Sequence, residues 1–120
     1  MSAAQVTEKR WTMLKRKIVY ICSPLRFNYD RNKIKANLYQ RYAYEKGCLP
    51  LAPHIIFPQF LDDEKKSERK AGMDMGLQLL ELCDELWVFG PRISEGMKAE
   101  IELARKLGKP TKYISGDLDE

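Results

Sequence analysis

Residues 85–114 of this chain read ELWVFGPRISEGMKAEIELARKLGKPTKYI, and this stretch decides the predicted fold. Residues 85–89 are a short apolar run closed by a Gly-Pro pair, which is typical of a buried strand. Residues 96–107 have helical spacing and end at a glycine, and residues 110–114 predict another strand. A strand, a helix and a strand in this order favour a parallel pair joined by a right-handed crossover.

The preceding part of the chain repeats this alternation. Residues 17–22, KIVYIC, predict a buried strand, and residues 49–52 predict a brief one. Residues 30–46 and 71–83 have the spacing of helices, whereas 53–70, with prolines and a charge run, predicts an extended loop with a single helical turn. The whole pattern predicts an α/β protein with a Rossmann-like or flavodoxin-like three-layer fold and a parallel sheet of four or five strands.

Length and composition predict one domain. Of the 120 residues, 32% are charged and 44% are hydrophobic, a balance that excludes a disordered chain and is typical of a soluble globular protein. We expect residues 1–16 to be a lead-in segment, residues 17–115 to be the domain and residues 116–120 to be a tail. A core of this size is adequate for a single domain.

Charge and cysteine usage limit the classes of partner and cofactor that we expect. The net charge is +4, but acidic residues are interleaved with the basic ones, so we expect no nucleic-acid polymer as partner. Three cysteines without CxxC spacing and a single histidine make a zinc site hard to assemble, so we expect reduced thiols, no metal and no cofactor. No apolar run approaches the roughly 18 residues of a membrane span, and no signal peptide is visible, so we expect a cytoplasmic protein without a membrane partner.

Ligands of doubly wound sheets bind beyond the carboxyl ends of the strands, at the switch point of the strand order. In this sequence that edge comprises residues 23–28, 53–57 and 90–96. The loop after the first strand offers a hydroxyl, turn amides and a guanidinium for phosphate recognition. Its candidate residues are Ser23, Pro24, Leu25 and Arg26. A surface ion pair is the alternative for the arginine.

A second anion site is predicted where the helix near residue 96 begins. Ser94 precedes that helix, and the backbone amides around Gly96 and Met97 would face an anion. Ser94 as a simple N-cap is the alternative interpretation. On a helical wheel Glu100 lies at about 300° from Met97, among the apolar residues. An inward carboxylate is costly unless it is paired or used, so Glu100 is the main catalytic candidate, with a structural carboxylate bonded to loop amides as the alternative.

His54 follows the second strand at the same edge and is a candidate proton donor or ligand contact. A histidine without either role is the alternative. Four aromatic residues are expected either to stack on a base or to pack in the core: Tyr20, Phe27, Phe57 and Phe60. Core packing explains Trp87 and Cys22.

Four segments together resemble the nucleoside 2-deoxyribosyltransferase-like superfamily. They are YICSPLR after the first strand, APH after the second, CDELWVFG as the third strand, and SEGMKAEIELARKLGKP. The resemblance covers most of residues 17–113. The segment PHIIFPQFLDDEKKSER resembles an insertion of a less characterised bacterial and phage subfamily.

The resemblance implies roles for individual residues. Glu100, four residues after Gly96, stands at the position of the family nucleophile that attacks the anomeric carbon. Ser94 has the spacing of a phosphate-binding serine in the branch that resembles 2′-deoxynucleoside 5′-phosphate N-hydrolase, and Ser23 and Arg26 loosely match its first loop. Transferases that accept unphosphorylated nucleosides usually carry an aspartate where Ser94 stands, so the resemblance favours nucleotides.

One position departs from the family pattern. The family generally carries an aspartate upstream of the CD pair of the third strand, and Gly76 occupies that spacing here. Asp74 lies two residues earlier, which on a regular helix is about 200° away, so it is a doubtful catalytic residue.

Together these features predict cleavage or transfer of the N-glycosidic bond of a (deoxy)nucleoside 5′-monophosphate-like substrate, with Glu100 as the nucleophile. The expected partner is a small-molecule nucleoside or nucleotide. The resemblance also implies a homo-oligomer, a dimer or higher. The alternative function is a nucleotide-binding module on the same fold that acts as a sensor or sponge without turnover.

Overall fold

The computed structural model of the chain describes residues 15–24 and 29–115. Strands and helices alternate along this part of the chain. Their order and bounds are β1 (Ile18–Cys22), α2 (Tyr29–Glu45), β2 (Leu49–Leu51), α3 (Pro53–Ile56), the 3-10 helix η2 (Phe57–Gln59), α4 (Lys66–Leu82), β3 (Glu85–Phe89), α5 (Glu95–Lys106) and β4 (Thr111–Ile114). Each strand is thus separated from the next by helical segments, as parallel pairing requires.

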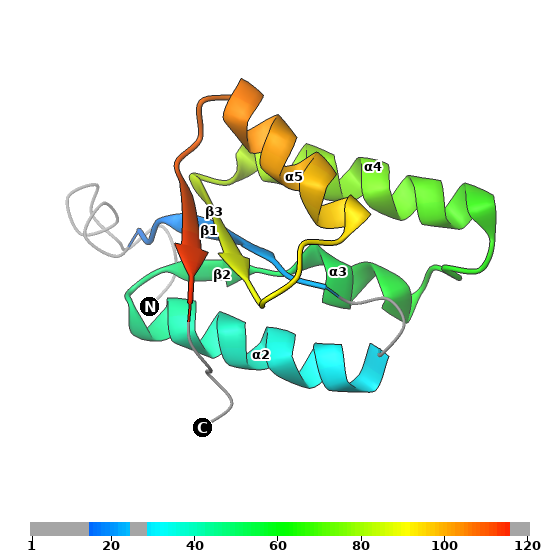
Figure 1. The fold of residues 1–120 in the computed structure, drawn as a ribbon, viewed down its shortest axis with the longest axis horizontal. Helices are drawn as coiled ribbons and strands as arrows, with labels where there is room; N and C mark the ends of the chain where they lie inside the picture. The colour runs from blue at the N-terminus through cyan, green and yellow to red at the C-terminus, as the bar shows by residue number, and fades with distance from the viewer. Residues whose placement is uncertain (1–14, 25–28, 116–120) are drawn as a thin grey trace, which may run out of the picture.

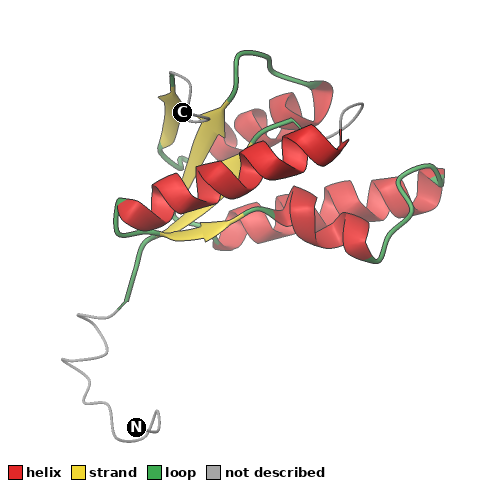
Figure 2. Cartoon of the chain, turned by 90° about the horizontal axis from the view of Figure 1, so that it is seen from below, coloured by secondary structure: helices red, strands yellow, loops and turns green. Residues whose placement is uncertain are grey.

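The strands form one parallel sheet in the order β2-β1-β3-β4. Tyr20 of β1 pairs with Leu51 of β2 on one side and with Leu86 of β3 on the other. The helix α2 covers one face of the sheet, and α4 and α5 cover the other (Figure 1 and Figure 2). This arrangement confirms the predicted three-layer α/β fold, with four strands in the described part of the chain.

The two central strands are buried on both faces, which explains why they read as continuous apolar runs. Successive side chains of a strand point to opposite faces, and β1 follows this rule. Val19 and Ile21 pack in the core beneath α2, whereas Tyr20 and Cys22 pack in the core beneath α4 and α5. The second set points toward the helix that carries Glu100.

The segment 53–70 is more helical than its sequence predicted, so the expectation of an extended loop was wrong. Pro53 stands in the first turn of α3, where the fixed backbone angle of proline suits a helix start. The second half of the charge run belongs to α4, which begins at Lys66 and carries an ion pair one turn apart between Lys70 and Asp74. Charged pairs on a solvated helix face lack the apolar periodicity by which helices are recognised.

The other element bounds agree with their predictions to within a residue or two. Gly47 and Gly108 follow α2 and α5 with φ angles of 85° and 69°, the left-handed conformation in which glycine ends helices. Within the described residues, none of the helices combines the length and the apolar character that a membrane crossing needs.

Candidate functional site

The switch point of the sheet lies between β1 and β3, because the chain runs outward from β1 to β2 and then returns to β3. In doubly wound sheets ligands bind beyond the carboxyl ends of the strands at such a point. Here the ends of β1 and β3 lie next to each other, because a side chain at Gly90 would contact Pro24 at 3.5 Å. The helix α5 begins just beyond this edge (Figure 1).

Glu100 lies in the first half of α5, and its half-buried side chain reaches β1. The Sγ atom of Cys22 donates a hydrogen bond to Oε1 of Glu100 at 3.6 Å. The hydroxyl of Tyr20 is a second uncharged donor close to this carboxyl and acts to lower its pKa. The acid therefore faces the last residues of β1, at the switch point of the sheet.

Neither donor was predicted from the sequence to contact Glu100. Tyr20, a candidate for base stacking, is only 2% exposed, so it packs in the core and presents its hydroxyl to Glu100. Cys22 was assigned to core packing alone. The alternation of β1 was the available signal, because it puts Tyr20 and Cys22 on one face of the sheet. The sequence alone does not show that α5 covers this face, because that depends on the order of the strands in the sheet.

Burial dominates the electrostatics of Glu100. It raises the pKa of this carboxyl from its ordinary value of 4.5 to about 7, while hydrogen bonding from Tyr20 and Cys22 opposes the rise. Burial, followed by the nearby Glu100 charge, raises the pKa of the Tyr20 hydroxyl and of the Cys22 thiol well above their usual ranges. Both donors therefore stay protonated, and Glu100 is held by uncharged groups.

Ser23 and His54 form a second pair at the same edge. Ser23 follows β1 and is 6% exposed, and its Oγ lies 2.8 Å from Nε2 of His54 in α3. Burial lowers the pKa of His54 to about 4, so the imidazole is neutral near pH 7. A neutral imidazole can offer a hydrogen bond but is not a strong proton donor. The sequence placed both residues at this edge but not in contact with each other.

The start of α5 has a well-formed cap. Ser94 is the N-cap residue, and its Oγ accepts a hydrogen bond from the backbone N–H of Met97 at 3.3 Å. Met97 is buried in the core against the sheet, and its backbone N–H is already used by the cap. A side chain at Gly96 would meet nothing within 4 Å, so the approach to this helix start is open.

The remaining candidates are distributed differently. Asp74 is paired with Lys70 at 2.6 Å and its side chain is 59% exposed, so it belongs to the outer surface of α4. Phe57 and Phe60 contact each other edge to face, at 6.1 Å between ring centroids. Leu25, Arg26 and Phe27 lie outside the described residues.

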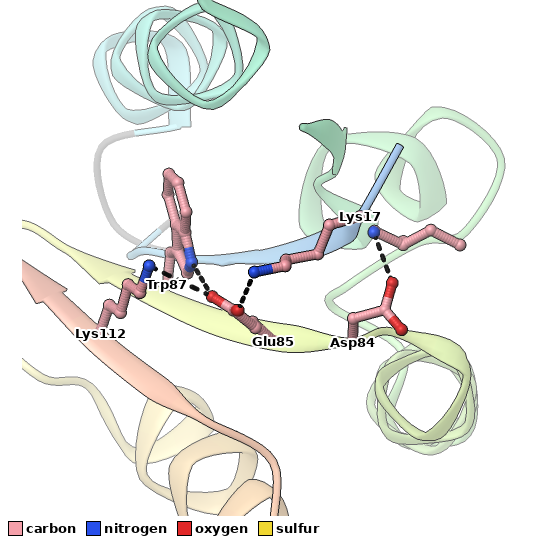
Figure 3. Close-up of polar contacts among 6 residues, drawn as sticks. Lys17, Asp84, Glu85, Trp87 and Lys112 are labelled. Atoms are coloured by element: carbon pink, nitrogen blue, oxygen red, sulfur yellow. Dashed lines mark hydrogen bonds and ion pairs between the residues drawn. The ribbon is translucent and has the colours of Figure 1, made fainter. Parts of the chain in front are cut away.

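The opposite edge of the sheet carries a different carboxylate, Glu85 (Figure 3). It accepts a hydrogen bond from Lys17 at 2.6 Å and one from the indole N–H of Trp87 at 2.9 Å, and Lys112 lies 3.6 Å away. Hydrogen bonding from Lys17 and Trp87 lowers the pKa of Glu85. This cluster joins β1, β3 and β4, and its polar groups are satisfied by one another.

Within the part of the chain that the structure describes, no group of three or more His, Cys, Asp or Glu side chains could hold a metal ion. The three cysteines, Cys22, Cys48 and Cys83, are buried free thiols. The groups that the structure places at the edge of β1 and β3 are a carboxyl with a raised pKa, two uncharged donors and a serine–histidine pair.

These features define an α/β protein with the fold of the nucleoside deoxyribosyltransferases. A 2-deoxyribosyltransferase from the psychrotolerant bacterium Bacillus psychrosaccharolyticus superposes with a TM-score of 0.61 and 20% identity, over 80% of this chain and 70% of that chain. The chain belongs to the family described as a domain of unknown function, DUF7768, which matches residues 17–114. Among curated proteins there is no significant match.

Proposed function

We propose that this protein cleaves or transfers the N-glycosidic bond of a (deoxy)nucleoside 5′-monophosphate, with Glu100 as the nucleophile. The observation that carries the proposal is the environment of this carboxyl. It lies at the switch point of the sheet, it contacts only uncharged donors among the described residues, and burial raises its pKa to about 7. A structural carboxylate is normally paired with a cation, whereas one kept without a cation is available to meet a developing positive charge.

The proposed reaction needs such a group. As the bond between C1′ and the base nitrogen breaks, the sugar acquires oxocarbenium character, and the Glu100 carboxylate stabilises it and forms a C1′–O ester bond. The departing base takes up a proton from solvent. Water then attacks C1′, gives up a proton in turn and releases the carboxylate. A second base in place of water would make the reaction a transfer.

Two neighbouring elements support a phosphorylated substrate. The hydroxyl of Ser23 and the cap of α5 at Ser94 flank the edge at which Glu100 lies, and both would offer donors to a 5′-phosphate. If Nε2–H of His54 donates to Ser23 Oγ, the serine proton is left to donate to the phosphate. Binding energy from the phosphate would then align C1′ with Glu100. A contact of His54 with the base would go through Nδ1.

One observation favours a second candidate, a nucleotide-binding module without turnover. α4 presents Gly76, and no carboxylate, to the Tyr20 hydroxyl beside Glu100. A site with a single acid has less to orient the sugar or to activate water. Such a module would retain ligand-dependent stabilisation, of roughly 2.7 kcal/mol at a ligand concentration 100 times its dissociation constant.

The test compares the wild type with Glu100→Gln and with a matched control, Glu95→Gln, which changes an exposed glutamate in the first turn of the same helix. Each protein is incubated with deoxynucleosides and their 5′-monophosphates, with and without a second free base, and chromatography measures released base and exchanged nucleoside. We expect release by the wild type and by Glu95→Gln only. Equal release by Glu100→Gln would refute the nucleophile, and binding without release from any substrate would support the module.

A further inference from the structure

Position 76 of α4 lies against the phenol of Tyr20. Gly76 is buried, and a Cβ atom built on it would come within 3.2 Å of the Tyr20 hydroxyl oxygen. That distance is closer than an ordinary van der Waals contact between carbon and oxygen. The missing side chain of Gly76 therefore leaves the space that the Tyr20 hydroxyl occupies.

Glycine is an unfavourable residue at such a position. In the interior of a helix it is clearly less favourable than alanine. Gly72, one turn earlier on α4, offers a comparison, because its Cβ would meet Leu61 Cδ1 at 3.6 Å, an ordinary contact. Helix propensity alone would favour alanine at both positions, but only at position 76 would the methyl group lie closer than van der Waals contact to a polar atom.

The Tyr20 side chain has little room to move away from a methyl group at position 76. It is 2% exposed, it sits in the middle of a central strand between β2 and β3, and its ring packs in the core beneath α4 and α5. Close packing of this kind passes a displacement on to the next contact. For the Tyr20 hydroxyl, that contact is the carboxyl of Glu100.

We propose that Gly76 is a positioning residue, whose missing side chain leaves the space that the Tyr20 hydroxyl needs to reach the Glu100 carboxylate. The inference deepens the proposed function and rests on it for its catalytic meaning. The contact chain runs from α4 through β1 to α5, so three separate elements place the acid. Gly76 touches no substrate and acts only through Tyr20.

The expected consequence is a change in the ionisation of Glu100. The groups that act on its carboxyl, within the described part of the chain, are the Tyr20 hydroxyl and the Cys22 thiol, and Asp74 of α4 is held at the surface by Lys70. A hydrogen bond to the charged form lowers the pKa of an acid, and hydrogen bonds weaken when their length or angle is disturbed. Gly76→Ala should therefore raise the pKa of Glu100.

The experiment measures the pKa of Glu100 by NMR in protein labelled with 13C at glutamate side-chain carboxyls, using Glu100→Gln to assign the signal. The variants are Gly76→Ala, the matched control Gly72→Ala, Tyr20→Phe, and Gly76→Ala combined with Tyr20→Phe. We expect an upward shift in Gly76→Ala that is smaller than the shift in Tyr20→Phe, and no shift in Gly72→Ala. On the Tyr20→Phe background, Gly76→Ala should add nothing, because the hydroxyl is already gone.

Equal pKa values in Gly76→Ala and Gly72→Ala would overturn the inference, as would an undiminished effect of Gly76→Ala on the Tyr20→Phe background. Circular dichroism would detect a loss of secondary structure. Alanine has a higher helix propensity than glycine, so the Gly76→Ala and Gly72→Ala variants should keep the helix. If the wild type also releases base, the acid limb of the pH–rate profile should move to higher pH in Gly76→Ala and not in Gly72→Ala. If it releases none, the proposed function fails while the pKa measurement still decides the role of Gly76.

Discussion

Two carboxylates, Glu85 and Glu100, sit at opposite ends of the same sheet in opposite electrostatic environments. Glu85 opens β3 and is surrounded by Lys17, Lys112 and the indole of Trp87, which keep its pKa low (Figure 3). Glu100 reaches the end of β1, where burial raises its pKa and its partners are uncharged. One acid is neutralised by its neighbours, whereas no cation among the described residues pairs with the other.

The difference separates a structural carboxylate from the proposed nucleophile. The cations around Glu85 lie directly before β1 and on β4, so this acid links three adjacent strands. No comparable tie is made by Glu100, since both its donors come from β1. Burying an acid without a cation costs stability, and groups kept in such a state are concentrated at functional sites.

The largest expected effect on the rate of base release comes from shortening Glu100, the proposed nucleophile. Glu100→Asp keeps the charge but withdraws it by one methylene, and a misplacement of about 1 Å can cost on the order of 10²-fold in rate. Glu100→Gln should lose at least about 10³-fold. Single-turnover base release by chromatography measures both. Full activity of Glu100→Asp would contradict an attacking role that depends on position.

The pH dependence of stability should have opposite signs for the two acids. The folded-state pKa of Glu100 is raised, so the folded protein binds more protons than the unfolded one between pH 4.5 and about 7, and stability falls as pH rises through that window. The pKa of Glu85 is lowered, so its contribution is present above its unfolded pKa and is lost as pH falls through the folded value.

Urea unfolding of the wild type and Glu100→Gln across this pH range isolates the first effect. Their difference cancels His54, which titrates nearby with the other sign because its pKa is lowered. The advantage of Glu100→Gln should grow from pH 4.5 to about 7, reaching at most about 3 kcal/mol, and then level off. A constant difference would mean that Glu100 titrates normally.

Substitution of Glu85 should lower the stability and leave base release unchanged. Glu85→Ala removes the acceptor of the buried Trp87 N–H, and an unsatisfied buried donor costs about 1–3 kcal/mol. Glu85→Gln keeps an acceptor and should cost less. Urea midpoints at constant m-value measure the loss. A fall in base release at full stability would show that the two edges of the sheet are coupled.

The smallest effect is expected at Asp74. Its exposed pair with Lys70 is worth about 0.3–0.5 kcal/mol, so Asp74→Asn should change the free energy of unfolding by no more than that. Base release and the pKa of Glu100 should be those of the wild type. A clear loss of activity in this variant would bring Asp74 back into the site.

Much of the fold could be read from residues close together in the sequence. The runs KIVYIC and ELWVF, the glycines that end two helices and the apolar spacing of α5 gave the three-layer architecture and turned Glu100 toward the sheet. These signals are local, because strand and helix periods are set by backbone geometry. The segment 53–70 was misjudged because its first helix is short and the start of α4 is stabilised by surface charges, which leave no periodic pattern.

What surrounds Glu100 was decided only by the tertiary structure. Cys22 stands 78 positions before Glu100, and Gly76 meets Tyr20 across the gap between α4 and β1. The sequence determined that an acid would face inward near the carboxyl edge of the sheet, because the helical period is fixed by neighbouring residues. It could not determine that this acid would meet two uncharged donors from β1, since sheet order and close packing, not local propensity, bring those side chains together.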